Sequence, residues 1–524
     1  MMEFILNLYL YFGRKKWLVL ASTACTIFAA LATKDSVQAK FNFGSTLEWY
    51  PGDIRMCSSV DQVLEVVEDA KSSGKRVKAF GTGWSWSTTI AGDGDTYIKL
   101  TGDLADATKA KINTSPTTDA PTPSATVGAG VLAFDLYLQL QNTGYNIEAK
   151  GNCLTADESQ TVGGLLATNV HHTGIRSFYD VVEWVEVVTA ESGLVRTLRD
   201  EPLFRLTIGG AGRTGVIVNV RFNLTPRDTY ERVNTDDITQ PENDTFEAFF
   251  QGFVDLTSPY EPMEFIAYGI RPPGLARLAN VQPPYSAWKR MAEPSAKSAI
   301  LPADFGNISI FAKSYLKVDP FLDFVLPSFV YDTVYLAALF IVLPGKQPQT
   351  EGTTGVDLDV ASSDTFTVRL KHQELEFFVP VDLLGQVGAY MDYRFDDGCY
   401  PYIRDHGLFA LRKVFGCNSL TAANGVLADG SSPDFIAVNI DSYQRKRWEQ
   451  YNAELNTLLA DLSTEFPEKI RTHPGKYNAP LSPNPEPQSV KDMIAAMDPQ
   501  GAFARDGYDP TYLTATPDND VKCS

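Results

Sequence analysis

The residues best suited to chemistry lie in a short segment that combines glycines with small hydroxyl side chains. An alternating strand at residues 76–80 continues into Gly-Thr-Gly-Trp-Ser-Trp-Ser at residues 81–87. Without a Cβ atom, glycine reaches positive φ and lets successive backbone N–H groups converge on an anion, to which hydroxyls add further donors. The segment therefore predicts a phosphate-binding turn, formed by Gly81, Thr82, Gly83, Trp84, Ser85, Trp86 and Ser87.

Two further glycine-containing loops are predicted in the same half of the chain, each beside a strand. Residues 161–174 read Thr-Val-Gly-Gly-Leu-Leu-Ala-Thr-Asn-Val-His-His-Thr-Gly, and residues 209–215 read Gly-Gly-Ala-Gly-Arg-Thr-Gly. Three such loops can close around one long cofactor that carries a diphosphate. The candidate contacts in these two loops are Gly163, Gly164, Thr168, His171, Thr173, Gly174, Gly212, Gly215 and Val216.

Residues 210–215 also match the Gly-x-Gly-x-x-Gly pattern of dinucleotide-binding sites. That motif requires a strand before it and a helix after it. Here residues 203–206 are predicted to be helical, whereas residues 216–222 are rich in β-branched side chains with an alternating pattern and are predicted to form a strand. The order is reversed, so a Rossmann site is not expected at this position.

Hydrophobic periodicity indicates the elements that position these loops. Apolar residues recur at helical spacing over residues 60–70, and a second helix is predicted at residues 133–141. β-Branched runs predict strands at residues 181–188 and 216–224. Beyond about residue 227 the chain changes to proline-rich loops and aromatic strands, which we interpret as a second domain. Its helical pattern near the end is formed by Trp448, Tyr451, Leu455, Leu458 and Leu459.

Residues 324–343 form a strongly apolar run in this second half. Four residues interrupt it: Pro327, Ser328, Asp332 and Thr333. The run is too broken to predict a transmembrane helix. We expect a buried strand or core helix, with docking to a membrane as the alternative.

The N-terminus has the layout of a secretory signal peptide. Basic residues at 14–16 precede an apolar run at 17–33, and small residues follow near 30–32 and 37–39. The run is long for a signal and short for a membrane span, so an uncleaved signal anchor is the alternative. In either case the rest of the chain is expected to be lumenal or extracellular. Five cysteines remain outside this segment, an odd number that predicts at least one unpaired or intermolecular thiol.

The overall charge restricts the partners of the protein. The chain of 524 residues has 64 acidic and 45 basic residues, a formal net charge of −19. This charge opposes binding to nucleic acid or to anionic membranes. No cysteine or histidine spacing indicates zinc, and the adjacent His171 and His172 would point apart on one loop or strand. We therefore expect no metal and no nucleic acid, and a small uncharged or locally bound ligand.

Taken in order, these segments resemble the flavin-binding domain of the vanillyl-alcohol-oxidase superfamily. The resemblance lies in the strand before Gly-Thr-Gly-x-Ser-x-Ser, in Thr-Val-Gly-Gly with its later Thr and His-x-x-Gly, and in Leu-Phe-Arg before a glycine-rich turn. Residues 374–380, 402–404 and 473–476 resemble the Glu-Tyr-x-x-Pro, Glu-x-Arg and His-Trp-x-Lys segments of the aldonolactone oxidases, a group that includes gulonolactone, galactonolactone and arabinonolactone oxidases and the alditol oxidases. The resemblance spans residues 49–478.

The resemblance implies an α+β fold with two domains. A PCMH-type FAD-binding domain is followed by a cap or substrate domain with a mainly antiparallel sheet flanked by helices. FAD would place its pyrophosphate on the 81–87 turn and its flavin near residues 168–174 and 209–215. The implied boundaries are 1–39 for the signal peptide or anchor, 40–228 for the FAD-binding domain, 229–465 for the substrate domain, and 466–524 for a segment that returns to the flavin site and ends in a tail.

Departures from the family pattern concern how FAD is held. Many relatives bond FAD covalently to a histidine at the position of Trp84, and an indole cannot form that bond, so non-covalent FAD is expected. Attachment through Cys153 is not expected, because this residue lies too far before Gly163. The family's Gly-Thr-His-Gly core reads Asn-Val-His-His at residues 169–172, so a different backbone path is expected where glycine is missing.

The resemblance also implies the catalytic residues. Lys476 would place a cation near flavin N1 and O2, where it stabilises the anionic reduced ring. Arg404 would orient or polarise the substrate oxygen, and His473 would shape the site or act as base. Tyr402 stands where the family has a glutamate, which leaves the proton acceptor open.

We therefore expect a secreted or lumenal FAD-dependent oxidoreductase, with attachment to a membrane through an uncleaved N-terminal segment as the alternative. It would oxidise a secondary hydroxyl of an aldono-1,4-lactone by hydride transfer to flavin N5, with O2 or another acceptor reoxidising the flavin. The alternatives are an alditol or sugar-alcohol oxidase, a flavin- or sugar-binding protein without catalysis, and a membrane-attached interaction protein. Retention of Arg404, His473 and Lys476 favours an enzyme.

Overall fold

The structure is a computed structural model, and all of the residues it describes belong to one unit, Lys40–Ser524. The predicted signal segment and the apolar run at 324–343 lie outside the described residues. Within the described part of the chain, no helix is long and apolar enough to cross a membrane. The described residues are 40–42, 47–90, 92–115, 122–140, 143–149, 159–171, 176–226, 230–233, 245–257, 263–267, 286–290, 373–406, 408–442, 448–476 and 487–503.

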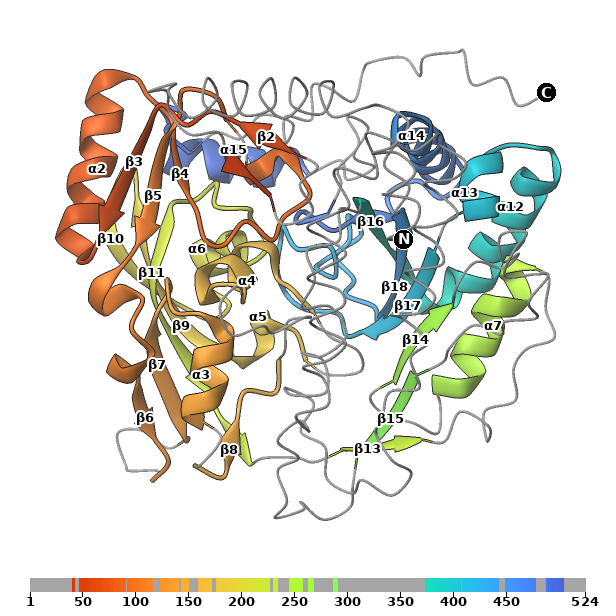
Figure 1. The fold of residues 1–524 in the computed structure, drawn as a ribbon, viewed down its shortest axis with the longest axis horizontal. Helices are drawn as coiled ribbons and strands as arrows, with labels where there is room; N and C mark the ends of the chain where they lie inside the picture. The colour runs from red at the N-terminus through yellow and green to blue at the C-terminus, as the bar shows by residue number, and fades with distance from the viewer. Residues whose placement is uncertain are drawn as a thin grey trace, which may run out of the picture. The chain divides into compact units, whose positions relative to one another are not determined.

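The two larger sheets of the N-terminal half have three and five strands (Figure 1). One is parallel with the order β3-β5-β4, and the other is antiparallel with the order β10-β9-β11-β7-β6. The strands predicted at 181–188 and 216–224 are β9 and β11, which pair with one another. The strands are β3 (Asp53–Cys57), β4 (Val77–Ala79), β5 (Thr96–Leu100), β6 (Lys111–Asn113), β7 (Ser124–Gly128), β9 (Val182–Thr189), β10 (Gly193–Leu198) and β11 (Val216–Asn223).

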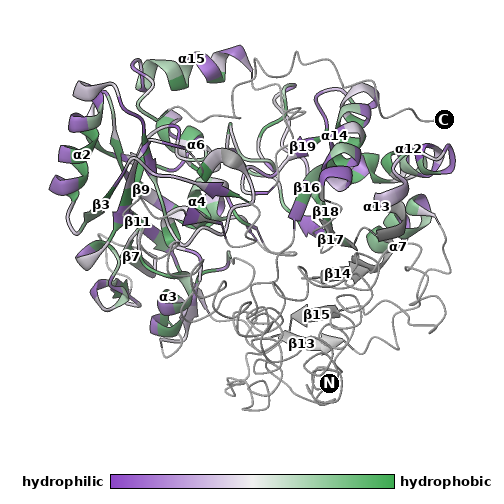
Figure 2. Ribbon diagram, turned by 45° about the horizontal axis from the view of Figure 1, so that its top comes forward, coloured by the Kyte–Doolittle hydropathy of each residue, from purple (hydrophilic) through white to green (hydrophobic). Residues whose placement is uncertain are grey.

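Helix α2 (Val60–Ser73) is the first predicted helix, and both of its ends carry the expected caps. The hydroxyl of Ser59 accepts a hydrogen bond from Gln62 N, and Gly74 ends the helix at φ +65°. Its apolar stripe is buried with residues of β5, β9 and β11 in one hydrophobic cluster. Figure 2 shows hydrophilic residues along the rest of α2, as expected for a helix that covers a sheet.

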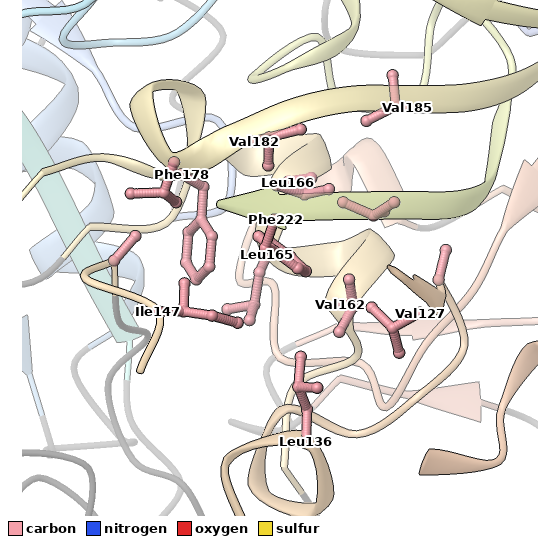
Figure 3. Packing of buried hydrophobic residues seen from close by; sticks show 14 of the residues in the cluster. Val127, Leu136, Ile147, Val162, Leu165, Leu166, Phe178, Val182, Val185 and Phe222 are labelled. Carbon is pink, nitrogen blue, oxygen red and sulfur yellow. The ribbon is translucent and has the colours of Figure 1, made fainter. Parts of the chain in front are cut away.

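A second hydrophobic cluster fills the space between the five-stranded sheet and its short helices (Figure 3). The helices are α3 (Ala133–Leu140), α4 (Val162–Thr168), α5 (Phe178–Val181) and α6 (Pro202–Thr207). Burying each aliphatic or aromatic side chain here contributes about 1.5–3 kcal/mol before the entropy of ordering is subtracted. Figure 3 labels Val127, Leu136, Ile147, Val162, Leu165, Leu166, Phe178, Val182, Val185 and Phe222.

A seven-stranded antiparallel sheet with the order β13-β15-β14-β17-β18-β16-β19 forms the centre of the C-terminal half. Figure 1 shows helices α7, α12, α13 and α14 beside this sheet. The strands are β13 (Tyr230–Val233), β14 (Met263–Ala267), β15 (Ser286–Arg290), β16 (Gln373–Pro380), β17 (Leu408–Val414), β18 (Phe435–Ser442) and β19 (Arg471–Thr472). The helices are α7 (Phe246–Thr257), α12 (Leu384–Asp396), α13 (Pro401–His406) and α14 (Trp448–Glu465).

The remaining described elements are short. They are β1 (Lys40–Phe41), β2 (Glu48–Trp49), β8 (Tyr145–Asn146), β12 (Thr225–Pro226) and α15 (Gln488–Met497). The mixture of helices with mainly antiparallel sheets confirms the predicted α+β class. Cys57 and Cys417 are buried free thiols and Cys399 is disulfide-bonded, so the odd cysteine count correctly predicted an unpaired thiol.

Strand β16 places the residues of one hydrophobic cluster and its two acidic residues on opposite faces by simple alternation. Leu375, Phe377 and Val379 are buried in a cluster with residues of α7, α12, α13 and α14. Because side chains in a strand alternate between the two faces, Glu374 and Glu376 belong to the opposite face. That face carries the acidic residues of the candidate site.

Close packing of α12 against α7 provides a test of this arrangement. A Cβ atom on Gly388 would lie 2.6 Å from Cα of Glu247, whereas one on Gly385 of the same helix would meet nothing closer than Gln251 Oε1 at 3.9 Å. We expect Gly388→Ala to destabilise the protein by about 1–3 kcal/mol through overpacking. Gly385→Ala should stabilise it by about 0.5–1 kcal/mol, because alanine favours the helix. Thermal unfolding of both variants checks the packing, and equal stabilities would contradict it.

Candidate active site

A cavity of about 570 Å³ is lined by residues from both halves of the chain. Its volume is within the range of roughly 300–1,000 Å³ common for ligand sites. Most of the residues predicted from the sequence lie in its wall. They are Gly81, Thr82, Gly83, Trp84, Ser85, Trp86, Gly163, Gly164, Thr168, His171, Gly212, Gly215, His473 and Lys476.

The first glycine segment forms an open turn immediately after β4. Gly83 adopts φ +79°, a conformation that side chains disfavour. Among the described residues, the backbone N–H groups of Gly81, Thr82 and Gly83 have no hydrogen-bond acceptor. A Cβ atom on Gly81 would lie 2.5 Å from Thr161 Oγ1, so glycine is needed for the second segment to approach. The turn therefore offers several donors to an anion at the cavity wall.

The second segment differs from its prediction, because Gly163 and Gly164 lie in helix α4 rather than in a loop. Thr161 caps this helix by accepting a hydrogen bond from Gly164 N at 3.2 Å. A Cβ atom on Gly163 would lie 3.1 Å from Ala129 O, so the glycine allows the helix to approach β7 closely. The helical assignment was missed because two adjacent glycines usually indicate a turn.

Asn169 adopts the backbone conformation expected of the glycine that the resembled Gly-Thr-His-Gly pattern has at this position. It ends α4 in the left-handed conformation at φ +47°, which asparagine tolerates better than most residues. Its side chain donates to Asn424 Oδ1 at 2.8 Å and accepts from Tyr179 N at 3.2 Å. The turn that leads to His171 is therefore fixed from two sides. Thr173 and Gly174 lie outside the described residues.

The third segment closes onto α4 through its backbone. Gly209 N donates to Leu166 O at 2.9 Å, and Ala211 N donates to Ala167 O at 2.7 Å. The segment follows helix α6 and precedes strand β11, which confirms that it is no Rossmann motif. Val216 does not line the cavity, because it is the first residue of β11 and is buried in the cluster with α2.

A C-terminal turn is bound directly to the first glycine segment. Trp86 N donates to Gly475 O at 2.8 Å, and Ser87 Oγ donates to Pro474 O at 2.7 Å. Ser87 was predicted to contact the cofactor, but it lies behind the cavity wall and holds this turn instead. The turn presents Lys476, whose Nζ lies 4.8 Å from the centre of the Trp86 ring and forms an ion pair with Glu374.

The buried carboxylate of Glu376 joins the two halves of the cavity wall. Its side chain is 1% exposed. Oε2 lies 3.1 Å from His171 Nε2, and Oε1 accepts from Arg412 Nη1 at 3.4 Å. Arg412 and Glu376 lie on strands separated by β18, where Arg412 pairs with the small Ala437 and Glu376 pairs with Asn439, so their contact runs diagonally across β18. The small side chain leaves room for the guanidinium to reach across the sheet.

These contacts keep Glu376 ionised. Burial raises the pKa of its carboxyl, but the charge and hydrogen bond of His171, with the charges of His473 and Arg412, lower the pKa to about 2. Burial lowers the pKa of His473 to about 4, against the opposing effect of Glu376. Because His473 is neutral above that pKa, we attribute the ionisation of Glu376 to the hydrogen bond donated by His171 and to the charge of Arg412.

Two residues of the site were missed from the sequence. Glu376 falls within the Glu-Tyr-x-x-Pro segment but was not assigned a role, and Arg412 was not considered. Arg404 lies in helix α13, and its side chain lies outside the described residues, so its role stays a prediction. Tyr402 is buried in the core beside Tyr451. Residues 408–414 read Leu-Phe-Ala-Leu-Arg-Lys-Val, which does not alternate between apolar and polar residues, so no local signal singled out Arg412.

His473 has a defined tautomer that bears on metal binding. His171, Glu376 and His473 each place one ligand atom within 4.8 Å of the others. However, His473 Nδ1 accepts a hydrogen bond from Gly475 N at 3.0 Å, so a neutral ring carries its proton on Nε2. Neither nitrogen then has a lone pair to offer to a metal. The cluster suits hydrogen bonding rather than coordination.

The cavity fits the predicted FAD by its chemistry. The N–H groups of the first glycine turn suit a pyrophosphate, and the buried Gln160 Oε1 in the wall lacks a partner among the described residues. The cavity wall also carries Glu376 of β16, Arg412 of β17, His473 and Lys476 of the C-terminal turn, and His171 of the turn after α4. FAD would thus be held by residues 81–86 and the α4 region, with the charged groups left to its reactive part.

Comparison with known proteins gives the same assignment. Residues 53–199 match the family model described as FAD binding domain, so this part of the chain is an FAD binding domain. The chain is 28% identical over 224 residues to decaprenylphosphoryl-beta-D-ribose oxidase of Mycolicibacterium smegmatis, a match that covers 41% of this chain and 45% of the relative. It is 33% identical over 119 residues to L-gulonolactone oxidase of Bos taurus, with 23% of this chain and 24% of the relative covered. It is 25% identical over 190 residues to D-arabinono-1,4-lactone oxidase of Candida glabrata, with 35% and 33% covered. The matched part therefore spans less than half the length of each relative.

Solved structures extend the likeness to nearly the whole chain. A solvent-stable cholesterol oxidase has a TM-score of 0.58 at 16% identity and covers 89% of this chain and 96% of its own. Cholesterol oxidase from B. sterolicum has a TM-score of 0.58 at 13% identity and covers 91% and 96%. At such identities the likeness concerns the fold, and it confirms the predicted fold class.

The tautomer and burial of His473 predict a specific dependence of stability on pH. The pKa of His473 is lower in the folded protein than in the unfolded chain, so its contribution is present above pH ~6.5 and is lost as the pH falls toward about 4. The full loss is about 3 kcal/mol, whereas protonation of Glu376 matters only below about pH 4.5. We expect the melting temperature to fall less between about pH 7 and 5 in His473→Gln than in the wild type. Parallel melting curves of the two proteins would contradict this account.

Proposed function

We propose that this chain is an FAD-dependent oxidoreductase that oxidises a secondary hydroxyl of an aldono-1,4-lactone. The proposal rests on the FAD binding domain at residues 53–199 and on a cavity whose wall also carries charged and hydrogen-bonding groups. The names of two relatives describe lactone oxidases. The observation that carries the proposal is the set of groups on β16, β17 and the C-terminal turn, where Glu376, Arg412, His473 and Lys476 share one cavity.

The balance of charge favours an uncharged substrate. Arg412 is paired with Glu376, and Lys476 is paired with Glu374. These two ion pairs carry no net charge with which to bind a substrate carboxylate or phosphate, and the further wall residues Lys99 and Asp135 also add one charge of each sign. A lactone ring or polyol, which offers hydroxyls but no charge, fits this balance. The phosphoryl sugar in the name of the M. smegmatis relative fits it less well.

Arg412, Lys476 and His473 would each have a separate role at the site. When bound, FAD accepts a hydride from the carbinol carbon at flavin N5. Arg412 lies where it can donate to a substrate oxygen while Glu376 holds its guanidinium in place. Lys476 contributes positive charge at the cavity wall, where Trp86 and the C-terminal turn fix its direction. His473 can donate a hydrogen bond from Nε2.

Non-covalent binding of FAD is part of the proposal. Trp84 lines the cavity in the first glycine turn, and its indole cannot form the histidyl bond of many relatives. Oxygen or another acceptor would reoxidise the flavin. Residues 1–39 predict entry into the secretory pathway, with cleavage of the signal or retention as an anchor, and this localisation stays a prediction.

Spectroscopy of the purified protein tests the function. We expect a visible flavin spectrum, release of FAD on denaturation, and anaerobic loss of the oxidised flavin absorbance on addition of L-gulono- or D-arabinono-1,4-lactone. Alditols such as xylitol, which are also uncharged, are tested in the same anaerobic titration. Faster reduction of the flavin by an alditol than by the lactones would favour a sugar-alcohol oxidase. A colourless protein would refute FAD binding. A yellow protein that none of these compounds reduces would favour the non-catalytic alternative.

Substitution of Lys476 tests whether its positive charge assists flavin reduction. We expect Lys476→Met to slow flavin reduction by about 10²–10³-fold, since a positioned charge at developing negative charge is worth about 2.7–4 kcal/mol. Lys469→Met is the matched control, because Lys469 forms an exposed ion pair with Asp429 away from the cavity. The rates are compared at equal FAD content, and an unchanged rate in Lys476→Met would remove this residue from the proposed mechanism.

A further inference from the structure

The hydrogen bond between His171 and Glu376 fixes the position of the ring proton. The ionised carboxylate can only accept, so Nε2 of His171 carries the hydrogen at the 3.1 Å contact. In a neutral ring the lone pair is then on Nδ1. This atom is buried and has no hydrogen-bond partner among the residues that the structure describes, although His171 lines the cavity.

An unpartnered ring nitrogen in the wall of a cavity needs a ligand to explain it. Leaving a buried acceptor without a partner costs about 1–3 kcal/mol. The carboxylate that creates this arrangement is itself buried and is held by Arg412, so the arrangement is fixed from the other side as well. The rings of Phe378 and His473 lie 5.1 and 5.6 Å from the His171 ring and restrict its rotation.

His473, the other histidine of the described cavity wall, cannot offer a ring nitrogen that accepts a proton from a ligand. His473 Nδ1 already accepts from Gly475 N, and its neutral ring carries the proton on Nε2. The charged groups near His171 are Glu376 from β16 and Arg412 from β17, with His473 from the C-terminal turn. His171 is therefore the histidine of this wall with an uncommitted acceptor.

We propose that His171 Nδ1 accepts the hydroxyl proton of the substrate, and that Glu376 is the positioning residue that holds the required tautomer. The inference rests on the proposed function. The carbinol C–H bond breaks and its electron pair passes with the hydrogen to FAD. The O–H bond breaks as its proton moves to Nδ1, and a carbonyl forms. The substrate is oxidised, FAD is reduced, and the imidazolium later returns its proton to water.

A tautomer measurement tests this inference without relying on turnover. With five histidines in the chain, ¹⁵N spectra of labelled protein can be assigned by comparison with His171→Gln. We expect His171 to be protonated at Nε2 and bare at Nδ1, and to lose this preference in Glu376→Gln. A ring protonated at Nδ1 alone, or at both nitrogens near neutral pH, would overturn the proposal.

Rates of anaerobic flavin reduction provide a second test of the roles of His171 and Glu376. We expect His171→Gln to lower the rate of anaerobic flavin reduction by about 10²–10⁴-fold, the usual contribution of a general base. If Glu376 acts through His171, the double variant His171→Gln/Glu376→Gln should be no slower than His171→Gln. Additive losses would show that Glu376 acts independently and overturn its positioning role.

Controls separate this inference from the proposed function. Glu186 lies on β9, where its carboxylate binds Arg196 of β10 and Asn219 of β11, and it does not line the cavity. Glu186→Gln should therefore keep the wild-type rate. All variants are compared at equal FAD content and with their melting curves. If lactones and alditols fail to reduce the wild type, the proposed function fails. If they reduce His171→Gln as fast as the wild type, only the further inference fails.

Discussion

The buried carboxylate of Glu376 is the constraint on which the site depends. An ionised group that is 1% exposed is strongly destabilising unless opposite charge and hydrogen bonds surround it. His171 reaches it from the turn after α4, and Arg412 reaches it from β17. These requirements tie the FAD binding half to the seven-stranded sheet at the point where a substrate would react. Moving either half away would expose or unpair this charge.

A second set of contacts links cofactor binding to the same point. The first glycine turn holds the C-terminal turn through Trp86 and Ser87, and that turn presents both His473 and Lys476. The main hydrophobic clusters lie behind these polar groups, on the helix-covered side of β16 and on both faces of the five-stranded sheet. Apolar packing therefore provides the rigid frame, while the hydrogen bonds at its edge set the positions of the reactive groups. This division leaves the cavity wall free to carry unpaired donors and acceptors.

Prediction from the sequence succeeded where a pattern is local. The periodicity of residues 60–70 and the β-branched run at 216–224 correspond to α2 and β11, and the reversed order around residues 210–215 correctly excluded a Rossmann motif. Prediction was wrong for Gly163 and Gly164, because an N-cap from Thr161 and close approach to Ala129 override their turn preference. It also placed Ser87 in the cofactor site, although its hydroxyl binds a backbone carbonyl from a turn nearly 400 residues later.

The sequence by itself determined the glycine turn, the order of the motifs and the presence of Trp84 where relatives bond to FAD, because each depends on residue type and short spacing. Only the tertiary structure decided which polar residues meet. Glu376 and Arg412 are 36 residues apart, and His171 lies 205 residues before Glu376. The contact between Glu376 and Arg412 depends on strand register, which pairs Glu376 with Asn439 and Arg412 with the small Ala437 on the intervening strand β18. The physical reason is that a charge is stabilised by whatever the fold brings within hydrogen-bond distance, and no local pattern in the chain records that.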